Sequence, residues 1–339
     1  MKKKIFIAFL VLSVAVAVVG MWAYHNFFSP AIGERFSLVL HSDESYEDMI
    51  AKVERNIEHD LAFEFYACYL GLDDSGIEAG TYKFQKDMSV IEVARMLKFG
   101  SDNCVRLVIN NARTPEILAG KIAMQIDADS VAVLSALRNK ELIKEFGFDS
   151  AEAMFSIFIP NTYEVYANVT PEALVRRMKQ ESDKFWGDES RQRGLARSGL
   201  TPYEAMTLAS IVHEETSVKD EFARVAGVYI NRLERGMLLQ ADPTLKYAAG
   251  DPTIKRVLNR HKEIDSPYNT YIYLGLPPTP IAMPDMAAIE GVINYEAHNY
   301  LYFCARPEMD GRHNFARTLT EHNRNAAAYH RALDRLKIR

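Results

Sequence analysis

Residues 201–216 read TPYEAMTLASIVHEET, and this segment predicts a helix whose start is well defined. Thr201 and Glu204 form a capping box, because each side chain can bond to the backbone N–H of the other residue. Pro202 occupies the first helical position, where its missing N–H costs nothing. The apolar residues that follow define one stripe along the helix: Ala205, Leu208, Ala209, Ile211 and Val212. We therefore expect this helix to pack into the core of the fold.

Two glutamates close this helix, and helical phase separates them. At about 100° per residue, Glu215 lies about 60° from the centre of the stripe and Glu214 about 160° away. Glu214 is therefore expected to face solvent, and Glu215 to lie where the helix meets the rest of the protein. Partial desolvation raises the pKa of a carboxyl, as a general acid near neutral pH requires. The alternative is that Glu215 only pairs with an arginine such as Arg224 or Arg232.

Composition narrows the possible functions. The chain has 339 residues, room for about two domains, and a formal net charge of −5. Without a basic field there is no electrostatic support for a nucleic-acid partner. The three cysteines Cys68, Cys104 and Cys304 lie far apart. Their spacing argues against a zinc site, and their odd number argues against a full disulfide framework.

The N-terminus carries the pattern of a membrane anchor. Lys2, Lys3 and Lys4 precede an apolar run over residues 5–23, which as a helix would be about 28 Å long. The lysines favour a cytoplasmic N-terminus, which places everything after Tyr24 outside the cytoplasm. A cleaved signal peptide is the alternative, but its apolar region is normally about 7–15 residues and ends at a small-residue cleavage site. We therefore expect an anchor over residues 1–24.

Local patterns predict a small α+β module over residues 34–100. The predicted elements begin with a strand at 36–40, a helix that Ser42 caps and that ends near Arg55, and a helix over about 59–69. A strand at 80–82 follows, and a capping box at Ser89 and Glu92 then opens a helix to about Leu97. Further strands are expected at 104–109 and 300–304. Helices are expected to begin at Thr114-Pro115, Asp129-Ser130, Thr170-Pro171 and Thr201-Pro202, and a last one spans about 319–337. Residues 238–284 are dense in Pro, Asn, Asp and Tyr, as expected of loops that line a site.

Several sequence blocks resemble the YceG-like (MltG) family of endolytic murein transglycosylases. Residues 209–216, ASIVHEET, are similar to the family segment ASIVExET, whose second acidic residue is the catalytic glutamate. This match assigns the catalytic role to Glu215. Further blocks follow in family order: 229–233 (YINRL), 236–244 (GMLLQADPT), 266–271 (SPYNTY), 275–281 (GLPPTPI), 300–303 (YLYF), 313–315 (HNF) and 321–323 (EHN). Weaker matches lie upstream, at 79–82 (AGTY) and 159–163 (IPNTY).

The chain also departs from the family pattern. His213 replaces the first acidic residue of the catalytic segment, which suggests that this residue is not the essential acid. Ala241 replaces a threonine. Phe155 and Ser156 stand where the family usually has Glu-Gly, so any help that glutamate gives elsewhere must come from other residues here.

The resemblance implies an α+β fold in three parts: a cytoplasmic start and single transmembrane helix (1–24), a LysM-like module (34–100) and a YceG-like catalytic region (101–339) with its core motifs at 200–330. It implies a single-pass protein of the cell (inner) membrane, with the catalytic region on the outer, periplasmic face. Its partners would be peptidoglycan glycan strands, the membrane and peptidoglycan synthases (penicillin-binding proteins). No cofactor, metal or nucleic acid is implied.

The implied reaction cleaves the β-1,4 bond between N-acetylmuramic acid and N-acetylglucosamine within nascent strands, which terminates their elongation. Glu215 protonates the glycosidic oxygen and then accepts the proton of the C6 hydroxyl, which closes on C1 to leave a 1,6-anhydro end. Side chains of the types that hold sugars accompany it in the matching blocks: Asn231, Gln240, Asp242, Ser266, Tyr268, Asn269, Tyr271 and His313.

Alternatives remain open for individual residues and for the function. Asp242 could order its loop, Asn231 could brace its helix, and His313 could be a buried hydrogen-bonding histidine. A muramidase-like hydrolase would use Glu215 and Asp242 as two carboxylates. A non-catalytic wall-binding membrane module would use the LysM-like part as its working surface and would not need Glu215.

Overall fold

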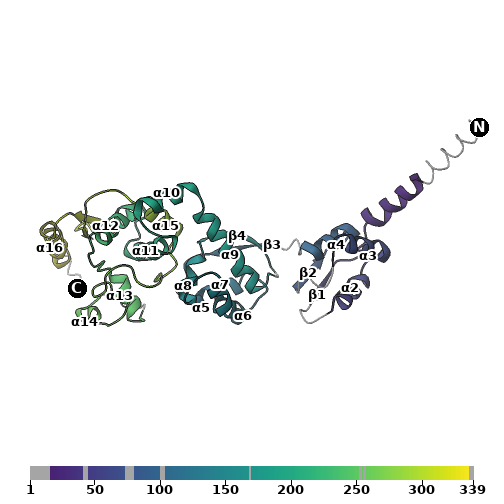
Figure 1. The fold of residues 1–339 in the computed structure, drawn as a ribbon, viewed down its shortest axis with the longest axis horizontal. Helices are drawn as coiled ribbons and strands as arrows, with labels where there is room; N and C mark the ends of the chain where they lie inside the picture. Colours follow the sequence, from purple (N-terminus) through teal and green to yellow (C-terminus); the bar gives the residue numbers. More distant parts are fainter. Residues whose placement is uncertain are drawn as a thin grey trace, which may run out of the picture. The chain divides into compact units, whose positions relative to one another are not determined.

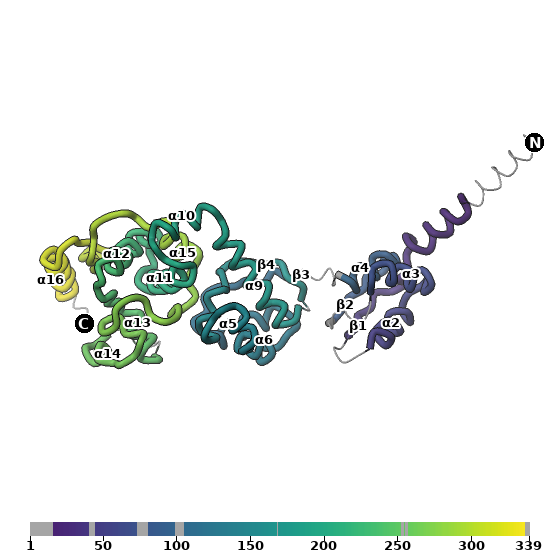
Figure 2. Tube along the Cα trace, in the orientation of Figure 1, coloured from purple at the N-terminus to yellow at the C-terminus, as the bar shows by residue number. Residues whose placement is uncertain are grey.

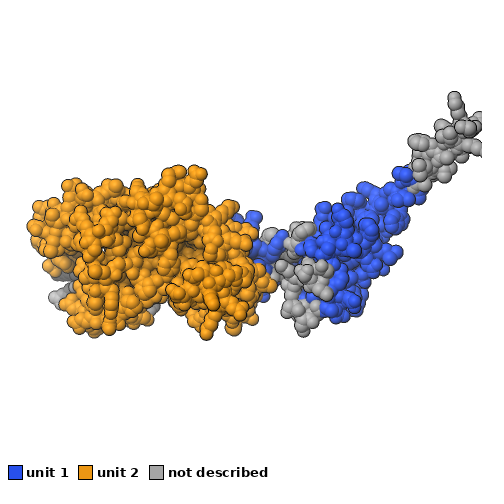
Figure 3. Space-filling view, viewed as in Figure 1, with its two compact units in different colours: residues 1–106, 125–127, 164–169 blue, residues 107–124, 128–163, 170–339 orange. Residues whose placement is uncertain are grey.

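The computed structural model describes most of the chain as two compact units, coloured separately in Figure 3. The described residues are 16–40, 45–72, 80–99, 104–167, 169–251, 254 and 257–335. Unit 1 comprises residues 1–106 with 125–127 and 164–169, and unit 2 comprises 107–124, 128–163 and 170–339. Helices and short two-stranded sheets make up both units, so the α+β prediction is confirmed.

Unit 1 is a strand, two helices, a strand and a further helix, in the order that the sequence predicts (Figure 1). A helix over residues 16–28 precedes β1 (Phe36–Leu40), α2 (Tyr46–Glu54), α3 (Asp60–Tyr69), β2 (Gly80–Phe84) and α4 (Val90–Phe99). β1 and β2 pair antiparallel, with Leu38 opposite Tyr82. The core forms where the helices cover this sheet, and Phe63, Tyr82 and Val93 are fully buried in it.

Capping explains where two of these helices begin. Glu92 accepts hydrogen bonds from the backbone N–H of Ser89 at 2.8 Å and from its hydroxyl at 2.7 Å, so the predicted capping box opens α4. α2 begins at Tyr46 because the Ser45 hydroxyl accepts from the N–H of Asp48. The predicted cap, Ser42, lies outside the described residues.

The helix over residues 16–28 is the described end of the predicted anchor. Residues 1–15, which hold much of the apolar run, lie outside the described ranges. Within those ranges, no helix is both long enough and apolar enough to cross a membrane.

Unit 2 is mainly helical, and Figure 2 traces its path. β3 (Cys104–Ile109) and β4 (Asn161–Tyr166) are each divided between the two units. The first part of unit 2 otherwise contains α5 (Pro115–Ala123), α6 (Ser130–Leu137), α7 (Lys140–Glu145), α8 (Ala151–Met154), η1 (Phe155–Ile157) and α9 (Pro171–Trp186). The remainder contains α10 (Glu189–Ser198), α11 (Pro202–Glu215), η2 (Lys219–Glu221), α12 (Phe222–Glu234), α13 (Asp242–Ala248), α14 (Asn259–Lys262), α15 (Met286–Ile293), β5 (Tyr302–Ala305), β6 (His313–Ala316) and α16 (Leu319–Arg335). β3 pairs with β4, and β5 pairs with β6.

α11 is the central element of unit 2. It contacts α12, α13 and α15, and all residues from Ala205 to Val212 are buried. The predicted helix start is confirmed, because both bonds of the Thr201–Glu204 capping box form. The expectation of loops at 238–284 is wrong in part: Asp242 begins α13, with Pro243 in its first turn, and α14 follows.

Close packing of α15 against α12 depends on Gly291. A Cβ added there would lie 2.7 Å from the Cβ of Phe222 and 3.2 Å from the nitrogen of Ala223. Gly120, inside α5, has open space around the same position. The two helical glycines therefore form a matched pair for testing this contact.

We expect Gly291→Ala to destabilise the protein by about 1–3 kcal/mol, because the helices must separate to admit the methyl group. Gly120→Ala should stabilise it by about 0.5–1 kcal/mol, because alanine loses less backbone entropy on folding. Urea unfolding of the two purified variants measures both changes. Equal effects of the two substitutions would contradict the close approach of α15.

Candidate active site

The C-terminal end of α11 places Glu215 at the edge of the core. The helix ends there because the next residue, Thr216, has an extended backbone (φ −145°, ψ 145°). The hydroxyl of Thr216 accepts a hydrogen bond from the N–H of Val218, which fixes this turn. Glu215 is half-buried and lines a cavity of about 360 Å³. The carboxyl is thus largely surrounded by protein yet accessible from the cavity.

Tyr229, on α12, is the direct partner of this carboxyl. Its hydroxyl donates to Oε1 of Glu215 at 2.6 Å. Burial raises the pKa of Glu215 from 4.5 to about 7; the hydrogen bond from Tyr229 lowers this pKa, and the negative charge of Asp242 raises it. Desolvation also raises the pKa of Tyr229 well above 10, so this tyrosine stays a hydrogen-bond donor. Glu215 is therefore protonated in a large fraction of molecules at neutral pH, as a general acid requires.

Three more of the predicted residues, Gln240, Asp242 and Tyr271, line the same cavity as Glu215. Tyr271 donates its hydroxyl to Oδ1 of Asp242 at 2.6 Å. Gln240 adopts a left-handed backbone (φ 52°), which is uncommon for a residue with a Cβ and is found most often at functional sites. Its N–H donates to the carbonyl of Thr270 at 3.0 Å, and its side-chain oxygen accepts from Arg232 at 3.4 Å. These bonds hold polar groups at fixed positions around the cavity.

A hydrogen bond to the buried carboxyl of Glu221 positions His313, which also lines the cavity. Its Nδ1 lies 2.8 Å from Oε2 of Glu221, and its backbone N–H donates to Oε1 of the same carboxylate at 3.1 Å. Glu221 is only 3% exposed. Sequence reasoning missed Glu221, because nothing in its local sequence indicates a partner 92 positions away. His313 is therefore both a hydrogen-bonded buried histidine and a cavity residue, although the sequence left these as alternatives.

The other four predicted sugar-binding residues make hydrogen bonds within the protein. The amide of Asn231 donates to the carbonyls of His298 and Tyr300 at 2.8 and 2.9 Å. Asn269, fully buried, donates to the carbonyls of Lys262 and Ile264.

The other two bind within their own loops. The hydroxyl of Tyr268 lies 2.8 Å from that of Thr279, and the hydroxyl of Ser266 accepts from the N–H of Tyr268. The polar atoms of all four residues bond to backbone or neighbouring groups, and their assignment to substrate binding stays a prediction. The predicted residues that share the cavity are Glu215, Gln240, Asp242, Tyr271 and His313.

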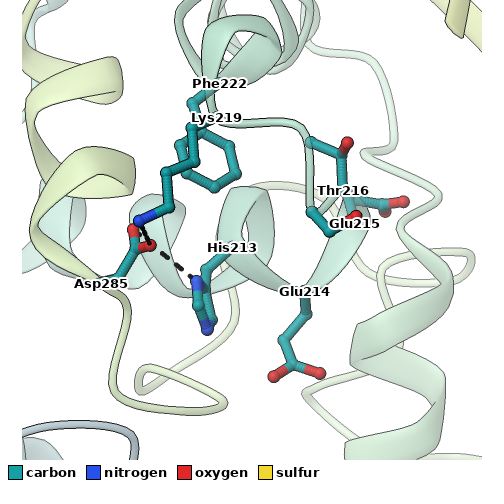
Figure 4. Close-up of a pocket in the computed structure, with 8 residues that line it drawn as sticks. His213, Glu214, Glu215, Thr216, Lys219, Phe222 and Asp285 are labelled. Atoms are coloured by element: carbon teal, nitrogen blue, oxygen red, sulfur yellow. Dashed lines mark ion pairs between the residues drawn. The ribbon is translucent and has the colours of Figure 1, made fainter. Parts of the chain in front are cut away.

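Glu214 departs from its predicted solvent-facing position. One guanidinium nitrogen of Arg113, Nη2, donates to both of its carboxylate oxygens, at 3.0 and 2.7 Å, and 20% of the Glu214 side chain is exposed. The side chains of Glu214 and Glu215 point in different directions from the end of α11 (Figure 4). The reason for the error is that the segment before α5 covers the face of α11 that helical phase assigns to solvent.

Two further cavities adjoin the end of α11. One, of about 440 Å³, is lined by both glutamates together with His213, Lys219 and Asp285. In it the carboxylate of Asp285 lies 3.4 Å from Nζ of Lys219 and 3.8 Å from Nδ1 of His213 (Figure 4). The other, of about 300 Å³, is lined by Glu214, Arg113 and Lys246, among others. Glu215 thus borders two cavities and Glu214 borders two, with one cavity in common.

Comparisons with known proteins agree on one family. The profile of the YceG-like family matches residues 38–328. The chain is 30% identical to an endolytic murein transglycosylase of Bacillus subtilis, over 83% of this chain and 80% of that protein. It is 27% identical to an endolytic murein transglycosylase of Streptococcus pneumoniae, over 80% of this chain and 54% of that longer protein. A crystal structure of a yceG-like protein from Listeria monocytogenes matches 86% of this chain and 98% of its own, with a TM-score of 0.54 and 25% identity.

The raised pKa of Glu215 predicts a pH-dependent gain in stability for Glu215→Gln. The folded state holds this proton more tightly than the unfolded state, so the ionised carboxylate destabilises the fold above pH 7. Below pH 4.5 both states are protonated and the penalty vanishes. The variant should therefore be more stable than the wild type by at most about 3 kcal/mol at pH 8, and equally stable at pH 4. Thermal unfolding at the two pH values measures the difference.

Glu214→Gln is the matched control for this measurement. It weakens the ion pair with Arg113, so it should not stabilise the protein at pH 8. If Glu215→Gln stabilises the protein equally at pH 4 and pH 8, the carboxyl of Glu215 does not have the raised pKa that desolvation produces.

Proposed function

The chain belongs to the YceG-like family, and on that premise we propose that it is an endolytic murein transglycosylase with Glu215 as its acid and base. The observation that carries the proposal is a half-buried carboxyl with a pKa of about 7, beside a cavity, at the position of the family's catalytic glutamate. The names of the Bacillus and Streptococcus relatives support the same activity.

The proposed reaction needs one group that first donates and then accepts a proton. Protonated Glu215 gives its proton to the glycosidic oxygen as the bond to C1 of N-acetylmuramic acid breaks, and C1 gains oxocarbenium character. The ionised carboxylate then takes the proton of the C6 hydroxyl while that oxygen bonds to C1. The products are a 1,6-anhydro end and a free 4-hydroxyl on the leaving N-acetylglucosamine, and no water is consumed.

The hydrogen bond from Tyr229 supports both halves of this cycle. It stabilises the carboxylate formed after the first proton transfer, because a hydroxyl donor interacts more strongly with an ionised acceptor. It also fixes Oε1, which leaves Oε2 to face the reacting oxygens. Gln240, Tyr271 and His313 would hold the sugar's hydroxyls and acetamido groups from the cavity wall.

Cleavage within a strand requires space for sugars on both sides of the broken bond. The cavities that adjoin Glu214 and Glu215 offer such space around the end of α11. An exo-acting enzyme would instead need a wall that stops the strand at one end. We propose that the adjoining cavities hold consecutive sugars of a nascent strand, whose elongation ends at the cut.

The cellular setting is part of the proposal. Residues 1–24 would anchor the chain in the cell (inner) membrane, with the catalytic region on the outer, periplasmic face. The LysM-like module over residues 34–100 would aid glycan binding. Peptidoglycan synthases would be its partners, because they supply new strands at the same surface.

A muramidase-like hydrolase is the second candidate, and one observation favours it. Asp242 lines the same cavity as Glu215, and its charge raises the pKa of Glu215. A second carboxylate near the acid is what a hydrolase uses, as a nucleophile or to activate water. The end group of the product separates the two candidates.

We expect Glu215→Gln to lower turnover of glycan strands by at least about 10²-fold, because the amide cannot exchange the proton. Wild-type products should carry 1,6-anhydro ends without label in ¹⁸O-water, measured by mass spectrometry of digested sacculi. Glu214→Gln changes one residue on the walls of the neighbouring cavities but leaves the proton of Glu215 in place, so it should lower turnover much less than Glu215→Gln. Labelled reducing ends would identify a hydrolase, and full activity of Glu215→Gln would refute the assignment.

Two of the groups that act on the pKa of Glu215 predict opposite shifts of the pH profile. Wild-type kcat/KM should fall above about pH 7 as the acid ionises. Asp242→Asn removes a charge that raises the pKa of Glu215, so the fall should begin at lower pH. Tyr229→Phe removes a bond that lowers this pKa, so the fall should begin at higher pH. Loss of all turnover in Asp242→Asn at every pH would instead indicate the two-carboxylate hydrolase.

A further inference from the structure

α3 exposes an apolar stripe on the surface of unit 1. Leu61, Phe65 and Tyr69 follow one another at a spacing of four residues, which places them on one face of the helix. They are 78%, 67% and 75% exposed. Cys68, exposed and free, lies on the same face. Soluble surfaces rarely present large apolar side chains in such a continuous row, so the stripe indicates a partner.

The stripe begins where the helix over residues 16–28 joins unit 1. Phe27 of that helix lies 6.0 Å from Phe65 and 6.3 Å from Tyr66, measured between ring centroids. Tyr66 in turn stacks on Tyr69 at 5.8 Å. The N-terminal helix itself exposes large apolar side chains on every side: Val16, Val18, Val19, Met21, Trp22, Tyr24 and Phe28. The two exposed apolar surfaces are therefore continuous.

The surroundings of this junction point to a lipid bilayer as the partner. Trp22 and Tyr24 are the residue types that gather at a membrane interface, and the sequence before them is apolar back to Ile5. Phe27 is five residues beyond Trp22, about 7.5 Å along a helix. Phe65, in contact with Phe27, thus lies within reach of the interface, where apolar side chains of surface-bound helices are buried about 5–10 Å deep.

We propose that α3 lies against the membrane surface, with Leu61, Phe65 and Tyr69 inserted among the lipid headgroups. The inference rests on the proposed anchor and extends the membrane contact from residues 1–24 to α3. Asp60 and Glu64 on the same helix are acidic, so attraction to anionic lipid does not drive this contact. Insertion should therefore be as strong in zwitterionic vesicles as in anionic ones.

Cys68 supplies a probe position inside the stripe. In the full chain with Cys104→Ser and Cys304→Ser, an environment-sensitive fluorophore on Cys68 reports its surroundings in phosphatidylcholine vesicles. We expect a blue-shifted emission that lipids with a nitroxide near the headgroup quench at least about twofold. The control carries the fluorophore on α2 instead, by Glu47→Cys with Cys68→Ser; Glu47 is exposed, and its probe should remain aqueous and unquenched.

A second variant separates insertion from anchoring. Leu61→Glu with Tyr69→Glu places charges in the stripe and leaves residues 1–28 and the Phe27–Phe65 contact unchanged. The chain should still float with vesicles, while the Cys68 probe returns to aqueous emission. Because both substituted positions are exposed, the fold should survive, and circular dichroism checks it.

Each other outcome overturns the inference. A chain that floats while the Cys68 probe is quenched no more than the Glu47→Cys probe leaves the anchor standing and refutes the contact of α3. A chain that does not float refutes both the anchor and the contact. Shielding of Cys68 that disappears as protein is diluted in the vesicles would show that a second copy covers the stripe. None of these results bears on the transglycosylase activity, which the product analysis tests separately.

Discussion

The burial of α11 on all sides is the constraint on which unit 2 depends. α12, α13 and α15 pack around it, and eight consecutive residues from Ala205 to Val212 are buried. A helix enclosed in this way meets solvent only at its ends. Its C-terminal end is one place where core packing meets an accessible cavity. Glu215 occupies that place, and the same packing brings Tyr229 within 2.6 Å of it.

Local signals in the sequence predicted the fold best. The capping boxes at Ser89–Glu92 and Thr201–Glu204 are each complete within four residues, so the starts of α4 and α11 were predictable. The β4 and β6 strands escaped prediction because their sequences, NTYEVY and HNFA, contain asparagine, which is depleted in strands, whereas the predicted β1 and β3 are mainly apolar runs. Helical phase failed for Glu214, because it assumes one solvent face, whereas Arg113 covers that face from 101 residues away.

The candidate site was predictable as a set of residue types but not as a set of roles. Loop-rich segments leave many backbone carbonyls without a helix or sheet partner, and buried carbonyls need donors. Asn231 and Asn269 serve that need, each bonding two carbonyls. Polar density in such a segment therefore predicts scaffold as readily as binding. Glu221 shows the converse: its importance comes only from contact with His313, which no local pattern reveals.

The surroundings of Glu215 also limit which substitutions the site can accept while Glu215 keeps a pKa near 7. A carboxyl with a pKa near 7 must be desolvated, and the same desolvation weakens the fold whenever the group ionises. Tyr229 offsets part of that cost by stabilising the ionised form, yet a stronger donor there would lower the pKa and remove the acid. The negative charge of Asp242 acts in the opposite direction. The pKa of Glu215 therefore reflects burial, which raises it most, together with the opposing effects of the Tyr229 hydrogen bond and the Asp242 charge; the charges of Lys246 and Arg232 also lower it. His213 lies outside this balance, since its nearest charged contact is Asp285 in the neighbouring cavity.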